Sequence, residues 1–309
     1  MTGTRRETEM DTKDLWVLDG GMGRELARRG APFRQPEWSA LALMEAPETV
    51  REVHQAYVAS GARVITTNSY ALVPFHIGDE RFAADGERLA ALAGQLARDV
   101  ADGQAGAVQV AGSLPPLFGS YRADLFEADR VSELATPLIR ALTPHVDIWL
   151  AETMSLIAEP LALKALLPED GKPFWVSFTL EDDAPGSEPR LRSGERVADA
   201  VTALASAGVD AILFNCCQPE VIEGALKVAS ARLQALGRTD IRLGAYANAF
   251  PPQPKEATAN DGLDEIRADL GPQDYLGWAE RWRAVGANLI GGCCGIGPEH
   301  IQALASRLR

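Results

Sequence analysis

The stretch "SGERVADAVTALASAGVDAILFNCC" (residues 193–217) contains one complete unit of a pattern that recurs along the chain. Its first part has apolar residues at helical spacing between Ser193, a candidate N-cap, and Gly208, a stop signal, which predicts a helix. The segment "DAILFN" (210–215) then forms a nearly continuous apolar run, typical of a strand buried on both faces of a parallel sheet. Two adjacent cysteines follow directly at the end of this predicted strand.

The same alternation of helix and strand extends over the rest of the chain. Helices are predicted at 47–62 and 272–288, among others. The apolar runs predict strands at 15–19, 63–68, 107–113, 147–152, 173–179, 210–215, 241–246 and 287–292. Eight strands alternating with helices predict a (β/α)8 TIM barrel, here one domain over 15–309 after a polar extension at 1–14. The residues 250–273 are predicted to be a long loop after the seventh strand.

A doubly wound α/β sheet is the alternative fold. That fold usually carries G-x-G-x-x-G after its first strand, where the glycines approach a dinucleotide. Here "LDGGMGREL" supplies Gly21 and Gly23, but Leu26 stands where the last glycine belongs. The dinucleotide interpretation is therefore weak.

The composition narrows the function classes. The chain has 309 residues, 46% hydrophobic residues and a net charge of -13, which argues against nucleic acid as a partner. The start "MTGTRRETEMDTKD" has no apolar core of a secretory signal, and no apolar stretch is long enough to span a bilayer. We therefore expect a cytoplasmic protein, without nucleic-acid or membrane partners, whose four cysteines are thiols or metal ligands rather than disulfides.

In a barrel the active site forms at the carboxyl ends of the strands, which places all four cysteines on one rim. Two follow the predicted sixth strand, and two lie in "NLIGGCCGIGPEHI" (288–301), after the predicted eighth strand. The flanking glycines permit a sharp turn, so that adjacent thiolates can converge on one ion. This pattern indicates a zinc site, in which a catalytic zinc keeps one position open; the alternative is that the cysteines are small buried apolar residues. Other polar residues expected at this rim are Asp19, Thr67, Asn68, Tyr70, Ser113, Glu152, Asn215, Tyr246 and Asn248.

Three motifs resemble the homocysteine S-methyltransferase family: "DGGMGREL" near the start, "FNCC" at a strand end, and "GGCCG" preceded by "GANLI". The resemblance extends from Asp19 to the final helix at "GPEHI". It implies a (β/α)8 barrel with a zinc ion that binds the homocysteine thiol, with Cys216, Cys293 and Cys294 as ligands. It also implies that Glu152 and Asp19 hold the substrate amino acid.

Further residues are candidates for contact with the substrate. Thr67 and Tyr70 match the family loosely, and Asn215 directly precedes the ligand cysteine of its doublet. Backbone N–H groups around Gly20 and Gly21 are expected to receive the substrate carboxylate. The simpler alternatives are that Asp19 caps the next helix and that Glu152 forms an ordinary ion pair.

These observations predict an enzyme that transfers a methyl group from a small sulfonium donor, S-methylmethionine or S-adenosylmethionine, to homocysteine, giving methionine. The chain has no Asp-x-His-x-x-Gly stretch of the cobalamin-binding type, which favours a small donor. Betaine as donor and another thiol as acceptor are alternatives within the same family. Many family members carry Pro-Asn where this chain has "YANAF", a departure that bears on the methyl donor more than on the metal. A non-catalytic zinc-binding barrel and a thiol redox protein remain as other classes.

Overall fold

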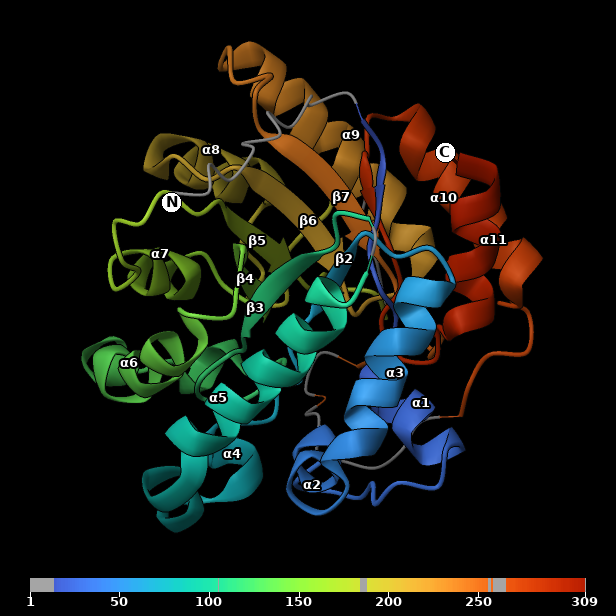
Figure 1. Cartoon of the computed structure of the whole chain (residues 1–309). Helices are drawn as coiled ribbons and strands as arrows, with labels where there is room; N and C mark the ends of the chain where they lie inside the picture. The colour runs from blue at the N-terminus through green and yellow to red at the C-terminus, as the bar shows by residue number, and fades with distance from the viewer. Residues whose placement is uncertain (1–13, 105, 184–187, 255–256, 258–264, 309) are drawn as a thin grey trace, which may run out of the picture.

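The computed structural model describes residues 14–104, 106–183, 188–254, 257 and 265–308. Helices surround a central set of strands (Figure 1). The strands are β1 (Trp16–Val17), β2 (Val64–Thr66), β3 (Gln109–Leu114), β4 (Ile148–Met154), β5 (Phe174–Phe178), β6 (Ala211–Asn215), β7 (Arg242–Tyr246) and β8 (Leu289–Ile290). The helices are α1 (Met22–Arg28), α2 (Ser39–Glu45), α3 (Pro47–Ala59), α4 (Pro74–Ile77), α5 (Asp79–Asp102), α6 (Val131–Leu142), α7 (Ala158–Lys164), α8 (Val197–Ala207), α9 (Pro219–Ala235), α10 (Pro272–Ala284) and α11 (Pro298–Leu308), with 3-10 turns η1 (Ala123–Leu125) and η2 (Ala128–Arg130).

The strands form one parallel sheet in the order β1-β8-β7-β6-β5-β4-β3-β2. Its two outer strands also meet, because Leu18 and Val64 form a parallel bridge and the Asp19 N–H donates to the Val64 carbonyl at 3.0 Å. The sheet is therefore a nearly closed barrel, as predicted, and each observed strand overlaps its predicted range. The doubly wound alternative is wrong. The helices predicted at 47–62 and 272–288 are confirmed as α3 and α10.

Successive residues of a strand belong to two different apolar layers, because side chains alternate across a sheet. In β6, Ile212 packs in the outer layer between sheet and helices, whereas Leu213 packs inside the barrel. The inner layer includes two tryptophans, Trp16 and Trp175, whose ring centroids are 6.4 Å apart. Both faces of the strands are buried, which explains why the strands read as continuous apolar runs.

The start of α8 differs from its prediction. The helix begins at Val197 rather than after Ser193, and Arg196 occupies the N-cap position without a side-chain cap. The Ser193 hydroxyl instead donates to the Glu195 carboxylate at 2.7 Å, so it stabilises the preceding turn. The predicted stop is confirmed, since Gly208 has φ +74, a left-handed conformation that favours glycine.

Two predictions fall partly outside the described residues. The polar extension at 1–14 is described only at Asp14, and residues 255–256 and 258–264 of the predicted loop are likewise outside. The described residues of 250–271 form no helix or strand, in line with the predicted loop. Across the described part of the chain, no helix combines the length and apolar character needed to cross a membrane.

Candidate functional site

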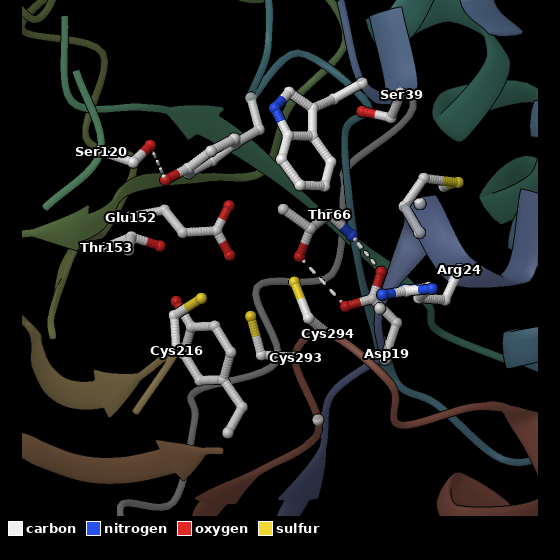
Figure 2. Close-up of a pocket in the computed structure, with 18 of the residues that line it drawn as sticks. Asp19, Arg24, Ser39, Thr66, Ser120, Glu152, Thr153, Cys216, Cys293 and Cys294 are labelled. Atoms are coloured by element: carbon white, nitrogen blue, oxygen red, sulfur yellow. Dashed lines mark hydrogen bonds between the residues drawn. The ribbon is translucent and has the colours of Figure 1, made fainter. Parts of the chain in front are cut away.

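A cavity of about 500 Å³ opens at the carboxyl ends of the strands. Its walls come from segments far apart in the sequence, from the turn after β1 to the turn after β8. Figure 2 shows polar and sulfur-bearing side chains pointing into this space. This cavity therefore lies at the rim predicted from the barrel pattern.

Three cysteines come together inside this cavity. The Sγ atoms of Cys216, Cys293 and Cys294 lie within 4.8 Å of one another (Figure 2). Sulfur ligands about 2.3 Å from a tetrahedral zinc ion would lie roughly 3.8 Å from each other, so the spacing suits such an ion. This trio is the ligand set implied by the family resemblance.

The chain separates the two cysteines of the first doublet by changing direction at the strand end. β6 ends at Asn215, and Cys216 has φ +52, a left-handed conformation that residues with a side chain rarely adopt. Cys216 lines the cavity, whereas Cys217 packs in the apolar layer outside the sheet. Burial raises the pKa of the Cys217 thiol well above its ordinary value, which keeps it uncharged. The geometry thus turns only Cys216 toward the cluster.

The second doublet sits in a turn tied to the segment after β7. The Cys293 N–H donates to the Ala247 carbonyl at 2.8 Å, and the Ala249 N–H donates to the Cys294 carbonyl at 2.8 Å. Gly295 follows with φ +84, which lets the chain reverse immediately after the doublet. These constraints hold both neighbouring sulfurs on the cavity side.

Gly20 and Gly21 allow the first and last turns of the barrel to touch. A Cβ on Gly21 would lie 2.5 Å from the Cys293 carbonyl oxygen, and one on Gly20 would lie 2.4 Å from the Ile296 carbonyl oxygen. The Gly21 N–H already donates to the Ile296 carbonyl at 2.9 Å. The Gly21 N–H therefore has a partner within the protein, and a role of the N–H groups around Gly20 and Gly21 toward a substrate carboxylate stays a prediction.

The charge balance of the cluster favours a cation. Contacts with the sulfurs of Cys216 and Cys294, followed by burial, raise the pKa of the Cys293 thiol well above its ordinary value. Three thiolates in contact inside a protein repel one another and lack solvation, so they cannot all ionise without a compensating positive charge. A dication bound by the three sulfurs would supply that charge, and the residues present therefore fit zinc.

Asp19 lies at the end of β1, in the wall of the cavity. Its two carboxylate oxygens accept hydrogen bonds from Thr66, one from the backbone N–H at 2.7 Å and one from the hydroxyl at 3.1 Å (Figure 2). Burial, with a smaller contribution from the Glu152 charge, raises the pKa of Asp19 to about 8. Asp19 does not cap the next helix, because Gly21 holds the N-cap position of α1.

Glu152 enters the cavity from β4. One of its carboxylate oxygens accepts a hydrogen bond from the Ser113 hydroxyl at 2.8 Å. Burial raises its pKa to about 7, despite the lowering effect of that hydrogen bond. The partner shown is a hydroxyl rather than a basic side chain, so this carboxylate keeps the capacity to pair with a cation in the cavity.

Thr67 and Tyr70 both line the cavity, but their hydroxyls already have protein partners. The Thr67 oxygen accepts the Ser113 N–H at 3.0 Å, and the Tyr70 hydroxyl lies 2.6 Å from the Ser120 hydroxyl. Thr67 therefore links β2 to β3. The Tyr70 hydroxyl likewise links the segment after β2 to Ser120.

The Asn215 side chain forms hydrogen bonds to the neighbouring strands β4 and β5. Its amide oxygen accepts from the Ser177 hydroxyl at 2.7 Å, and its amide nitrogen donates to the Thr153 hydroxyl at 2.8 Å. Its side chain is fully buried. Asn215 therefore bridges β4, β5 and β6 directly before Cys216, and its contact with a substrate stays a prediction.

Sequence reasoning missed several residues of the cavity. Thr66, which binds Asp19, adjoins the predicted Thr67, and Arg24 lies within the "DGGMGREL" motif, so both had a local signal. Trp38 lines the cavity through a backbone with φ +48 and stands edge-to-face with Phe33, with ring centroids 5.6 Å apart. Nothing in the local pattern predicts that backbone conformation.

Residues 16–308 match the family described as homocysteine S-methyltransferase. The homocysteine S-methyltransferase of Escherichia coli (strain K12) is 34% identical over 96% of this chain and 96% of its own length. Homocysteine S-methyltransferase 1 of Zea mays is 30% identical over 95% and 94%. The crystal structure of the E. coli homocysteine methyltransferase MmuM in its metallated form superposes with a TM-score of 0.76 at 32% identity, over 96% of this chain and 97% of that one.

Proposed function

The chain belongs to the homocysteine S-methyltransferase family, and on this premise we propose that it methylates the thiol of homocysteine with a small sulfonium donor, giving methionine. Zinc is the proposed cofactor, held by Cys216, Cys293 and Cys294. The observation that carries the proposal is the convergence of three thiols in a cavity that is also lined by the carboxylates of Asp19 and Glu152. A single barrel over 15–309 and residence in the cytoplasm are parts of the same proposal.

The three cysteines supply the reaction with a charged, sulfur-rich site. Zinc bound there would lower the pKa of the substrate thiol, so that an electron-rich sulfur is available at neutral pH. In the transfer, a bond forms between that sulfur and the methyl carbon as the bond from carbon to the donor sulfonium breaks, and the thiol proton is lost to solvent. The buried surroundings exclude water, which strengthens the interactions that orient the thiol.

Homocysteine also carries an ammonium and a carboxylate, which need partners of opposite charge. Glu152 and Asp19 are the proposed partners of the ammonium, since both carboxylates line the cavity, with Asp19 buried and Glu152 half-buried. Arg24 is the proposed partner of the carboxylate, because it brings a guanidinium to the same wall as Asp19 (Figure 2). Guanidinium groups bind carboxylates in a two-pronged geometry that also fixes orientation.

Arg24→Ala is expected to raise the KM for homocysteine while zinc content remains unchanged. Removing a guanidinium that binds a desolvated carboxylate should cost about 2–5 kcal/mol in binding. Steady-state kinetics with varied homocysteine and metal analysis measure both quantities. Arg28→Ala on the same helix is the control, since Arg28 pairs with the carboxylate of Glu25 away from the cavity. Equal KM values for wild type and Arg24→Ala would remove Arg24 from the substrate site.

The cavity offers aromatic surfaces to a cationic donor. The aromatic residues that line the cavity include Trp38, Phe33, Tyr70 and Phe250. A sulfonium or quaternary ammonium group gains attraction from ring faces while avoiding the need for hydrogen bonds. S-methylmethionine and S-adenosylmethionine are the preferred donors, and betaine is the alternative because it carries the same type of charge.

The function is tested by incubating purified, zinc-loaded protein with homocysteine and, separately, S-methylmethionine, S-adenosylmethionine and betaine. Methionine should form with at least one sulfonium donor. If methionine forms with betaine only, the proposed donor class is wrong and homocysteine remains the proposed acceptor. Absence of product with all three donors, despite stoichiometric zinc and a folded protein, would favour a non-catalytic zinc-binding barrel.

A further inference from the structure

The left-handed backbone of Cys216 requires support from other parts of the chain. Such a conformation costs roughly 1–2 kcal/mol for a residue with a side chain. The Cys216 carbonyl accepts two side-chain hydrogen bonds, from the Tyr121 hydroxyl at 3.2 Å and the Thr179 hydroxyl at 3.2 Å. Both donors come from segments outside β6, so the position of this cysteine depends on long-range contacts.

The same Tyr121 hydroxyl lies 3.0 Å from the Cys216 sulfur. A thiolate that binds a metal ion has no proton to donate, so in the metal-bound state the hydroxyl must be the donor. One O–H group is thus shared between the carbonyl and the sulfur of the same residue. This arrangement fixes the direction of the side chain as well as that of the backbone.

The ring of Tyr121 packs against the buried guanidinium of Arg192. The guanidinium carbon of Arg192 lies 4.6 Å from the centre of the Tyr121 ring, close enough for a cation–π interaction. Arg192 also donates to the carbonyls of Gln253 and Pro254, at 3.1 and 2.9 Å, and to the Asp182 carboxylate at 3.2 Å. The side chains of this ion pair are only 1% and 0% exposed.

The buried pair connects several loops of the rim. Asp182 accepts the backbone N–H of Gln218 at 3.1 Å and that of Gln253 at 3.0 Å, which joins the segments after β5, β6 and β7. A buried ion pair of this kind rarely stabilises a protein more than apolar residues of the same volume. Its geometry is better explained by positioning, because it holds Tyr121 on one side and the chain just after Cys217 on the other.

We propose that Tyr121, held by Arg192, is a positioning residue that donates a hydrogen bond to the Cys216 thiolate and thereby sets the direction and electron density of that metal ligand. The proposal rests on the metal-binding part of the proposed function. A hydrogen bond to a ligand sulfur withdraws charge from it, and partners of this kind typically change metal affinity about 10–100-fold. Tyr121 acts through Cys216 and does not itself bind the ion.

The test substitutes Co²⁺ for zinc and compares wild type with Tyr121→Phe. The variant should bind zinc about 10–100-fold more weakly in competition with a chelating dye, because the Cys216 sulfur is no longer held in the ligand position. Its sulfur-to-cobalt charge-transfer band should move to lower energy, because a thiolate without the hydrogen bond is more electron-rich. A purely structural role would lower the melting temperature without moving this band.

Tyr57→Phe is the matched control, since its buried hydroxyl donates to the carbonyls of Gly21 and Ile296 and to no ligand sulfur. It should lose some stability and keep the wild-type band. A folded Tyr121→Phe protein with unchanged band and zinc affinity would overturn the proposal. If the wild-type protein binds neither Co²⁺ nor zinc, both the metal site and the role of Tyr121 are wrong. If the band shifts in Tyr121→Phe but the wild-type protein does not methylate homocysteine, the role of Tyr121 is upheld and only the proposed reaction is wrong.

Discussion

Cys216→Ala is expected to lose both stoichiometric zinc and methyl transfer, whereas Cys217→Ala keeps both. The sulfur of Cys216 is one of the three that lie within 4.8 Å of one another, and Cys217 packs in the apolar layer outside the sheet. Removal of a direct ligand leaves two thiolates, so the loss of affinity should exceed the roughly 10–100-fold typical of a residue that only contacts a ligand.

The two variants control each other, because they remove the same atom from adjacent residues. Metal analysis after dialysis gives zinc per protein, and thermal unfolding reports the packing effect. Cys217→Ala should be destabilised by about 1 kcal/mol, the usual effect of deleting one buried heavy atom. Zinc retained by Cys216→Ala but lost from Cys217→Ala would show that the ligand assignment of the doublet is inverted.

The barrel was predictable because its signal is local and repeated. Strands buried on both faces appear as apolar runs such as residues 210–215, and the alternation with helices limits the architecture to few choices. The location of the cysteines followed from the same rule, since parallel strands end on one rim. The central parts of the helices could also be predicted from their apolar spacing. The start of α8 was placed wrongly, because the Ser193 hydroxyl donates to Glu195 rather than capping the helix.

The details of the site were less predictable because they depend on contacts between distant segments. The φ of +52 at Cys216 is supported by hydroxyls of Tyr121 and Thr179, and no pattern around Cys216 reveals these partners. Asn215 was placed in the substrate site by its position in the sequence, yet its amide is occupied by neighbouring strands. Alternation of side chains alone could not decide between two adjacent cysteines at a strand end.

Glu152→Gln is expected to reduce kcat/KM for homocysteine while zinc content and fold remain intact. The substitution keeps an oxygen for the Ser113 hydroxyl, which donates to Glu152 at 2.8 Å, and removes only the charge proposed to pair with the substrate ammonium. Removing one of the two carboxylates proposed to pair with that ammonium inside the cavity should cost about 2–5 kcal/mol. Since each 1.4 kcal/mol is a factor of ten, the expected decrease is roughly 30-fold to several thousand-fold.

The pH dependence provides a second measure of the same carboxylate. Burial raises the pKa of Glu152 to about 7, so the group is mostly protonated below that pH and mostly charged above it. Only the charged form attracts an ammonium, so the wild-type KM for homocysteine should rise as the pH falls through about 7. The glutamine variant has no proton to gain at this position, so its KM should lose the part of this change that Glu152 contributes, while Asp19, whose pKa burial raises to about 8, still titrates in this range.

Glu159→Gln is the matched control for both measurements. Burial also raises the pKa of Glu159 to about 7, but its carboxylate accepts the Leu117 N–H at 2.8 Å and lies outside the cavity wall. This variant should keep the wild-type KM and its pH dependence, because a buried titrating glutamate away from the substrate has no reason to affect binding. If Glu152→Gln behaved like Glu159→Gln, the Glu152 carboxylate would be a structural partner of Ser113 and the ammonium would have to be assigned to Asp19 alone.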